Sequence, residues 1–233
     1  MPGRPLRVED GQVVAHAARG EGWSEPPFET APDSSRSTRW TRDALDEHAS
    51  IGAFSRLSLQ LLGVGAPAVL IRATHEAALK QIKHAELCFA LASKFTGLSL
   101  RAGPLPLPHE IQLSYDLSAI GIEALLDGVV NEALSAAEAR ARLRLSKDDD
   151  ERAALRILAR DAAEQARLAE SIVGWCLETG GPTVVSAVLG AIERIVLVPT
   201  PTALDERAAA RIRRTVAIRV RGLLSGRAIA RTA

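Results

Sequence analysis

The amino-acid sequence predicts an all-α fold, and three observations lead to this prediction. The 233 residues are 47% hydrophobic but only 3% aromatic, and alanine and leucine supply most of the apolar side chains. Residues that favour β-strands are scarce, which argues against a β-sandwich or a barrel. From Thr41 onward, apolar residues recur at helical spacing in long segments that end at glycine or proline.

These glycine and proline signals divide the chain into six expected helices. Gly63 and Gly97 end the first two, and Gly181 with Pro182 separates the fourth from the fifth. The expected helices cover about residues 41–62, 67–96, 117–145, 151–179, 184–197 and 203–224.

The connections between these helices predict a four-helix bundle. The joints between helices one and two, and between three and four, are short, so each pair is expected to form an antiparallel hairpin. The stretch from Leu98 to Asp116 is long enough to cross the length of a bundle. We therefore expect an amino-terminal arm at 1–38, a bundle at 39–182 and a helical extension at 183–233 packed on it. Trp23 and Phe28 are candidates to hold the arm against the bundle.

Polar residues interrupt the apolar stripe of each of the first four helices near its middle. Burying such groups without partners costs several kcal/mol, so we expect them to meet one another, a metal ion or a ligand in one shared centre. The residues concerned are Glu47, Gln81, His84, Glu132, Asp161 and Gln165.

Residues 40 to 180 resemble the ferritin-like superfamily of di-iron carboxylate bundles. In that family, each hairpin supplies one Glu from its first helix and a Glu-x-x-His pair from its second, and two of the Glu residues bridge the irons. The segments that carry the resemblance are DEHASIGAFSRLSLQLLGVGAP, ALKQIKHAELCFALAS, DGVVNEALSAAEAR and LARDAAEQARLAESIVGW.

Only part of the family's ligand set is present. Glu47 matches the Glu from the first helix of the first hairpin, and Glu132 matches the Glu from the first helix of the second hairpin. His84 matches the His of the first hairpin. Asp161 matches an acidic residue that often precedes the ligand Glu of the second hairpin. In the family this residue contacts the ligands and does not bind the metal itself. The resemblance therefore implies that this chain keeps three of the family's six metal ligands.

The remaining ligand positions hold residues of other types. Gln81 stands where the family has one bridging Glu, Ala162 where it has the other, and Gln165 where it has the second His. A neutral amide lacks the charge needed to bridge two cations. We therefore expect a degraded di-iron site that holds at most one ion, ligated by Glu47, His84 and Glu132.

Three functions follow from this pattern. The first is a metal-free, buried polar pocket that binds a small molecule and acts by acid–base chemistry. The second is an oxidoreductase or oxygenase that uses one iron or manganese ion, and the third is a non-catalytic structural or interaction protein. For the first, the expected catalytic residues are Glu47, His84 and Glu132, and the expected substrate-binding residues are Gln81, Asp161 and Gln165.

The overall charge favours no macromolecular partner. The net charge is +1, with 29 basic and 28 acidic residues. The Arg-rich helix at 203–224 is expected to expose its basic face to solvent, so neither nucleic acid nor membrane is expected as a partner. We expect no secretory signal, no membrane-spanning segment, no disulfide, and a cytoplasmic location, and a homodimer is left open.

Overall fold

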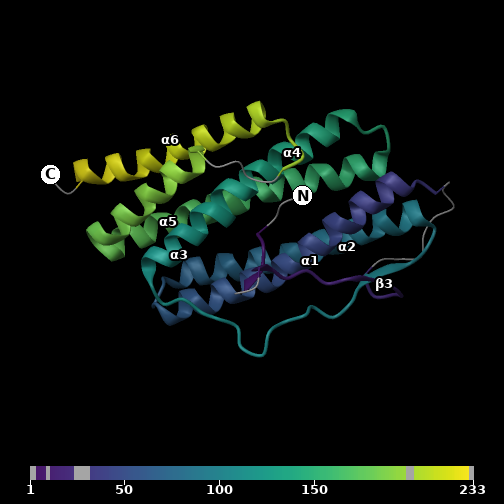
Figure 1. Cartoon of the computed structure of the whole chain (residues 1–233), viewed down its shortest axis with the longest axis horizontal. Helices are drawn as coiled ribbons and strands as arrows, with labels where there is room; N and C mark the ends of the chain where they lie inside the picture. Colours follow the sequence, from purple (N-terminus) through teal and green to yellow (C-terminus); the bar gives the residue numbers. More distant parts are fainter. Residues whose placement is uncertain (1–3, 9–10, 24–31, 198–201, 231–233) are drawn as a thin grey trace.

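The first helical hairpin consists of α1 (Ser34–Gly63) and α2 (Ala68–Thr96), which run side by side in the computed structural model (Figure 1). The structure describes residues 4–8, 11–23, 32–197 and 202–230. α2 begins directly after Pro67 and ends at Gly97, whose φ of 72° places it in the left-handed region. The sequence predicted Pro67 at the start of this helix and Gly97 at its end.

The start of α1 lies seven residues before the predicted start at Thr41, so that prediction was wrong. The side chain of Asp33 accepts a hydrogen bond from the backbone N–H of Arg36 at 3.0 Å and caps the helix. Trp40 lies in the additional turns and is buried, with its Nε1 donating to Glu151 at 2.7 Å. The helix therefore crosses the boundary that we expected at residue 38.

The second hairpin pairs a composite helix with one long helix. α3 (Leu117–Glu123), η1 (Ala124–Val130) and α4 (Asn131–Leu145) follow one another without a break, with the ends predicted for the third helix. η1 is π-helical, which the sequence did not indicate. α5 (Asp149–Leu197) returns beside all three and also contacts α2, so that the two hairpins pack together.

α5 is not straight. Gly181 has non-helical angles, with φ 65° and ψ −155°, and Pro182 follows it. This break falls between the helices expected at 151–179 and 184–197, as the glycine and proline signals predicted.

The remaining elements lie on the outside of the two hairpins. α6 (Glu206–Ala230) packs on α5 (Figure 1). Near the amino terminus, β1 (Arg7–Val8) pairs with β2 (Gly11–Gln12) in an antiparallel ladder. β3 (Ala17–Arg19) pairs with β4 (Leu100–Ala102), and thereby ties the arm to the crossover between the hairpins.

Trp23, one of the two expected anchors of the arm, contacts the bundle. Its ring lies edge-on to His48 at 5.1 Å and tilted against Phe89 at 5.9 Å. Phe28, the second expected anchor, lies outside the described residues. The buried Cys88 and Cys176 are both free thiols.

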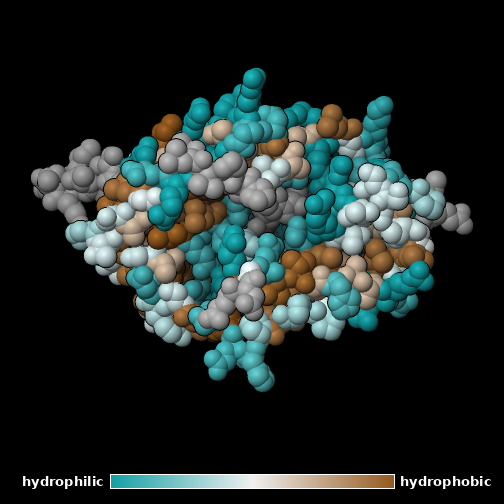
Figure 2. Space-filling model, in the orientation of Figure 1, coloured by the Kyte–Doolittle hydropathy of each residue, from teal (hydrophilic) through white to brown (hydrophobic). Residues whose placement is uncertain are grey.

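The surface alternates between apolar and polar regions. On the face shown in Figure 2, hydrophobic residues gather in separate patches with hydrophilic residues between them. Among the described helices, the part of α5 from Asp149 to Ile195 meets the length and composition criteria for a membrane-spanning helix. Core helices of packed proteins meet the same criteria, so the expectation of no membrane span stays a prediction.

Candidate functional site

The six polar residues singled out from the sequence are all buried and lie between two apolar clusters. One cluster contains Phe54, Leu125 and Ile172, and the other contains Trp40, Phe89 and Leu155. On α1, α2 and α5 the polar residues stand where one cluster gives way to the other, whereas Glu132 lies between Val130 and Leu134 of the first cluster. The structure thus brings together Glu47 from α1, Gln81 and His84 from α2, Glu132 from α4, and Asp161 and Gln165 from α5.

His84 joins two carboxylates through its two ring nitrogens. Its Nε2 lies 3.0 Å from Asp161 Oδ2, and its Nδ1 lies 3.4 Å from Glu47 Oε2. Asp161 also accepts a hydrogen bond from Arg160 Nε at 2.8 Å. The imidazole therefore lies between helices α1 and α5, with a carboxylate on each side.

This placement determines the protonation of His84. Burial alone would lower the pKa of the imidazole, but the hydrogen bonds with Asp161 and Glu47 raise it to about 9. For Asp161, burial raises the pKa, whereas His84 and Arg160 lower it further, so that the net value is about 2. At neutral pH the side chain of His84 is an imidazolium that donates from both nitrogens.

The two glutamines connect α2, α5 and α4 in a row of hydrogen bonds. With the Gln165 amide oriented so that its nitrogen faces Glu132, this nitrogen donates to the carboxyl oxygens of Glu132 at 3.2 and 3.3 Å. Its oxygen then accepts from Gln81 Nε2 at 3.1 Å. The amides that we expected to orient a ligand contact each other and Glu132.

Glu132 is a neutral acid at neutral pH. Burial raises the pKa of its carboxyl, and the nearby Glu47 raises it further. The positive charges of Arg4 and His84 lower it in part, so that the resulting value is about 8. Glu132 therefore keeps its proton at pH 7.

Arg4 is a member of this centre that the sequence did not reveal. Its side chain is only 2% exposed, and its guanidinium lies over the ring of Phe54, with 5.4 Å from Cζ to the ring centroid. Ser50 holds the segment in place by donating to the Arg4 carbonyl at 2.8 Å. The Nε and Nη2 atoms of Arg4 are buried without a hydrogen-bond partner. Arg4 precedes every expected helix, so no periodic pattern marked it.

The residues of the centre do not fit the metal site that the ferritin-like resemblance implies. Both ring nitrogens of His84 face carboxylates of this chain, at 3.0 and 3.4 Å, and neutral side chains stand at three of the six ligand positions. The guanidinium of Arg4 adds a positive charge next to Glu132. Within the described ranges, no group of three or more His, Cys, Asp or Glu side chains is arranged to hold a metal ion.

A cavity of about 1080 Å³ adjoins the centre, on the side of the amino-terminal segment. Arg4 lines it, whereas none of the six residues predicted from the sequence does. Residues from the amino-terminal segment, α1, η1, α4, the second part of α5 and the segment before α6 form its walls. Apart from Arg4, its charged lining residues are Arg7, Arg39, Arg42, Asp43, Asp46, Asp127, Glu138, Arg142 and Arg194.

Several acidic residues of this lining are already engaged by neighbouring groups. Asp127 accepts from Arg7 at 3.0 and 3.2 Å, and Asp43 forms an ion pair with Arg142. Burial raises the pKa of Asp46 to about 6. The walls of the cavity therefore contain internally paired charges as well as additional arginines.

Comparison of the chain with models of protein families, with curated proteins and with solved structures finds no match in any of the three. The function is therefore inferred from the residues of the centre and of the cavity.

Proposed function

We propose that this chain is a ferritin-like bundle protein that works without a metal and binds a small molecule in the cavity beside its former metal site. The arrangement of two helical hairpins joined by a crossover supports the ferritin-like part of the proposal. Glu47, His84 and Glu132, the three residues that match family ligands, lie in one buried centre.

The observation that carries the metal-free part is the position of His84 between two carboxylates. Its imidazolium supplies the positive charge that Glu47 and Asp161 require. Arg160 bonds Asp161 and supplies a second positive charge, and Glu132 is neutral at pH 7. The centre is thus balanced by side chains of this chain alone, without an added cation.

The cavity supports the binding part of the proposal. Its volume of about 1080 Å³ is comparable to that of sites for drug-sized ligands. Its walls combine apolar side chains with many charged ones, so a ligand there can meet both kinds of surface. We propose binding rather than catalysis, because Glu47, His84 and Glu132 do not line the cavity and an acid–base group must reach the proton it moves.

Two measurements on the full chain test this function. Elemental analysis of protein purified without a chelator should find far less than one iron, manganese or zinc ion per chain. A stoichiometric ion removed only by unfolding would overturn the metal-free proposal.

A cavity-filling variant tests binding. Ala141→Phe places a ring in the cavity wall, and Ala153→Phe, at an exposed position of α5 outside the cavity, is the control. In a thermal-shift screen of small molecules, compounds that raise the Tm of the wild type and the control should leave that of Ala141→Phe unchanged. Equal shifts in all three proteins would contradict the proposed site.

A further inference from the structure

Three exposed arginines whose guanidinium groups form no hydrogen bond in the described residues lie around the cavity. Arg39 and Arg42 extend from α1 and Arg194 from the second part of α5, and all three are exposed. In the described part of the chain none of them forms a hydrogen bond or an ion pair. These guanidinium groups therefore have their donors available to a ligand.

Arg4 adds a buried cation to the same lining. It is 98% buried, and its Nε and Nη2 have no hydrogen-bond partner. A buried donor without an acceptor costs free energy, and the cost is larger for a charged group than for a neutral group. A ligand that brings an acceptor to Arg4 would remove this cost, so binding of such a ligand is favoured. A carboxylate or phosphate oxygen is the acceptor that a guanidinium binds best.

The acidic residues of the lining do not cancel these positive charges. Asp127 is neutralised by Arg7 and Asp43 by Arg142. Glu138 accepts from the backbone N–H of Ala203 and the hydroxyl of Thr202, each at 3.4 Å. Asp46 lies close enough to Arg42 for the positive charge of Arg42 to lower the pKa of its carboxyl. The lining contains six arginines against four acidic residues, which still leaves an excess of positive charge for a ligand.

The cavity also has an apolar wall. It is formed by side chains of η1, the second part of α5 and the segment before α6, namely Leu126, Val130, Ile195 and Leu204. A ligand that fills both regions has an anionic end and an apolar body. A free inorganic anion would leave most of the volume and all of this wall unused.

We propose that the ligand of this cavity is an amphipathic organic anion, a carboxylate or a phosphate monoester with an apolar body. Arg4, Arg39, Arg42 and Arg194 hold its anionic end, and the apolar wall covers its body. This inference rests on the proposed function, because it names the class of molecule that occupies the cavity.

Isothermal titration calorimetry on the full chain tests it with probes of one length and different charge. Octanoate and octyl phosphate have both the negative charge and the apolar body. Octylammonium has the same body with a positive charge, and octanamide has it without a charge. Inorganic phosphate has the negative charge without the apolar body. Octanoate or octyl phosphate should bind at least tenfold more tightly than the other three. Added salt should weaken this binding, because the arginines at the rim are exposed.

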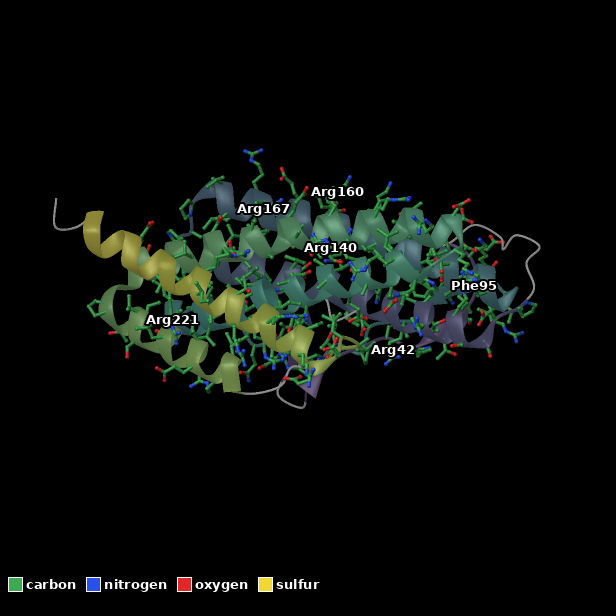
Figure 3. All side chains as sticks on the ribbon, turned by 90° about the horizontal axis from the view of Figure 1, so that it is seen from above. Arg42, Phe95, Arg140, Arg160, Arg167 and Arg221 are labelled. Carbon is green, nitrogen blue, oxygen red and sulfur yellow. The ribbon has the colours of Figure 1, made fainter. Side chains whose placement is uncertain are left out.

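Arginine variants locate the anionic end. Arg42→Gln and Arg194→Gln should each raise the Kd for octanoate about tenfold, the equivalent of one charge-assisted hydrogen bond. Arg167→Gln is the matched control, since Arg167 is exposed on α5 outside the cavity, on the opposite side of the molecule from Arg42 (Figure 3). All three positions are exposed, so the substitutions should leave the fold intact.

The outcomes separate this inference from the proposed function. Octanamide or octylammonium binding as tightly as octanoate, with Ala141→Phe abolishing that binding, would overturn the anionic ligand and retain the cavity as the site. No binding of octanoate or octyl phosphate at millimolar concentration would overturn the inference as well. Binding that Ala141→Phe leaves unchanged would overturn both.

Discussion

His84 occupies the position where a metal ligand was expected, and it acts there as a cation. Its two N–H groups face Asp161 and Glu47, and its pKa of about 9 keeps it protonated at neutral pH. Removing one partner from a buried charge pair costs more than the pair itself contributes, because the other charge remains buried. The stability of the centre therefore depends on this single proton.

His84→Ala should destabilise the protein by about 3–5 kcal/mol at pH 6, because it leaves the buried Glu47 without its cation and Asp161 with Arg160 alone. Urea unfolding measures the change. His109→Ala is the control, since His109 is exposed in the crossover. Equal unfolding free energies for the two variants would contradict the role assigned to His84.

The sequence revealed the members of the centre that lie on helices and missed the one that does not. Glu47, His84 and Asp161 were recognisable because each interrupts an apolar helical stripe. Arg4 stands in a segment with no periodicity, where a buried arginine and an exposed one have the same local pattern. The partners of the two glutamines were also beyond prediction, because a stripe shows which face is buried and not which neighbour meets it.

At the scale of the elements, η1 approaches α5 closely at Gly128. A Cβ built on Gly128 would lie 2.4 Å from the Cβ of Ala169, so a larger side chain cannot fit without displacing a helix. π-helical segments are often found at functional sites, and η1 directly precedes the helix that carries Glu132.

Gly128→Ala should therefore destabilise the protein by about 1–3 kcal/mol. Gly190→Ala, in the second part of α5, is the control, since its Cβ would meet only the end of Arg194 at 4.0 Å. That substitution should be neutral or stabilise by about 0.5–1 kcal/mol, through the better helix propensity of alanine. Thermal unfolding measures the change in stability of both variants. The Tm should fall for Gly128→Ala and stay the same or rise for Gly190→Ala.

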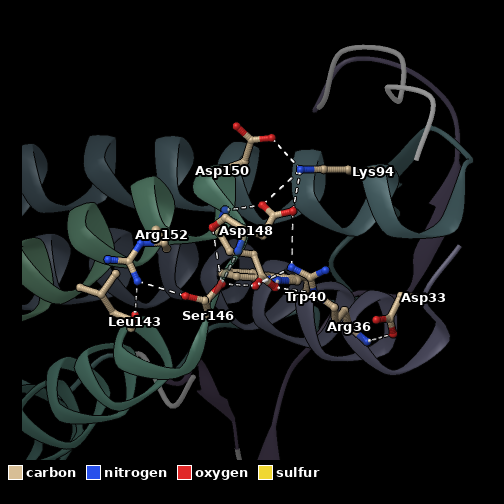
Figure 4. Close-up of polar contacts among 10 residues, drawn as sticks. Asp33, Arg36, Trp40, Lys94, Leu143, Ser146, Asp148, Asp150 and Arg152 are labelled. Atoms are coloured by element: carbon tan, nitrogen blue, oxygen red, sulfur yellow. Dashed lines mark hydrogen bonds and ion pairs between the residues drawn. The ribbon is translucent and has the colours of Figure 1, made fainter. Parts of the chain in front are cut away.

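The beginning of α1 is held by a polar cluster at the end of the bundle (Figure 4). Glu151 accepts from Trp40 at 2.7 Å and pairs with Arg36 at 2.7 Å. Lys94 at the end of α2 pairs with Asp148 at 2.9 Å. These contacts tie α1 and α2 to the start of α5.

Glu151→Ala should loosen the first two turns of α1, because it leaves the buried Trp40 without its acceptor. Amide hydrogen exchange should become faster at residues 34–40 and stay unchanged in the middle of α1. Asp149→Ala, the exposed neighbour at the start of α5, should have no such effect. Unchanged exchange in Glu151→Ala would show that other contacts hold this end.

Helix ends marked by glycine or proline were predictable, whereas those set by tertiary contacts were not. Pro67, Gly97 and Gly181 each act through backbone conformation, which the residue type alone determines. The start of α1 depends on Asp33 and on the packing of Trp40, within a stretch too polar to show a stripe. A π-helical segment has no distinct sequence signal, so η1 was not expected.

At the scale of the whole molecule, the buried centre sets the pH dependence of stability. Glu132 has a pKa of about 8 in the fold and 4.5 as a free side chain, so its contribution is complete below about 4.5 and is lost as pH rises through 8. The contribution of His84 is complete below 6.5 and is lost as pH rises through about 9. Asp161 has the opposite sign, and its contribution is lost only as pH falls from 3.8 through about 2.

The unfolding free energy should therefore fall between pH 6 and pH 9. Glu132→Gln keeps a neutral group at this position and should make that fall smaller, by on the order of 2 kcal/mol. Urea unfolding at several pH values measures both. Glu76→Gln, at an exposed position of α2, should retain the wild-type slope.

The pairing of neighbouring helices followed from the short connections between them, but the position of the cavity did not follow from the sequence. Two short joints and one long crossover were enough to predict two antiparallel hairpins. The cavity depends on where the amino-terminal segment and the residues before α6 lie against α1 and α4. Neither segment has a pattern that specifies its contacts, so the sequence placed the pocket at the polar centre itself.

The protonation of His84 is the most direct test of a metal-free centre. An NMR titration of its imidazole, assigned by comparison with a His84→Gln variant, should show both ring nitrogens protonated at pH 7 and an apparent pKa near 9. The signals should stay unchanged on addition of iron(II), manganese(II) or zinc(II). A neutral imidazole at pH 7 that loses its signal or shifts with one equivalent of metal would contradict the account.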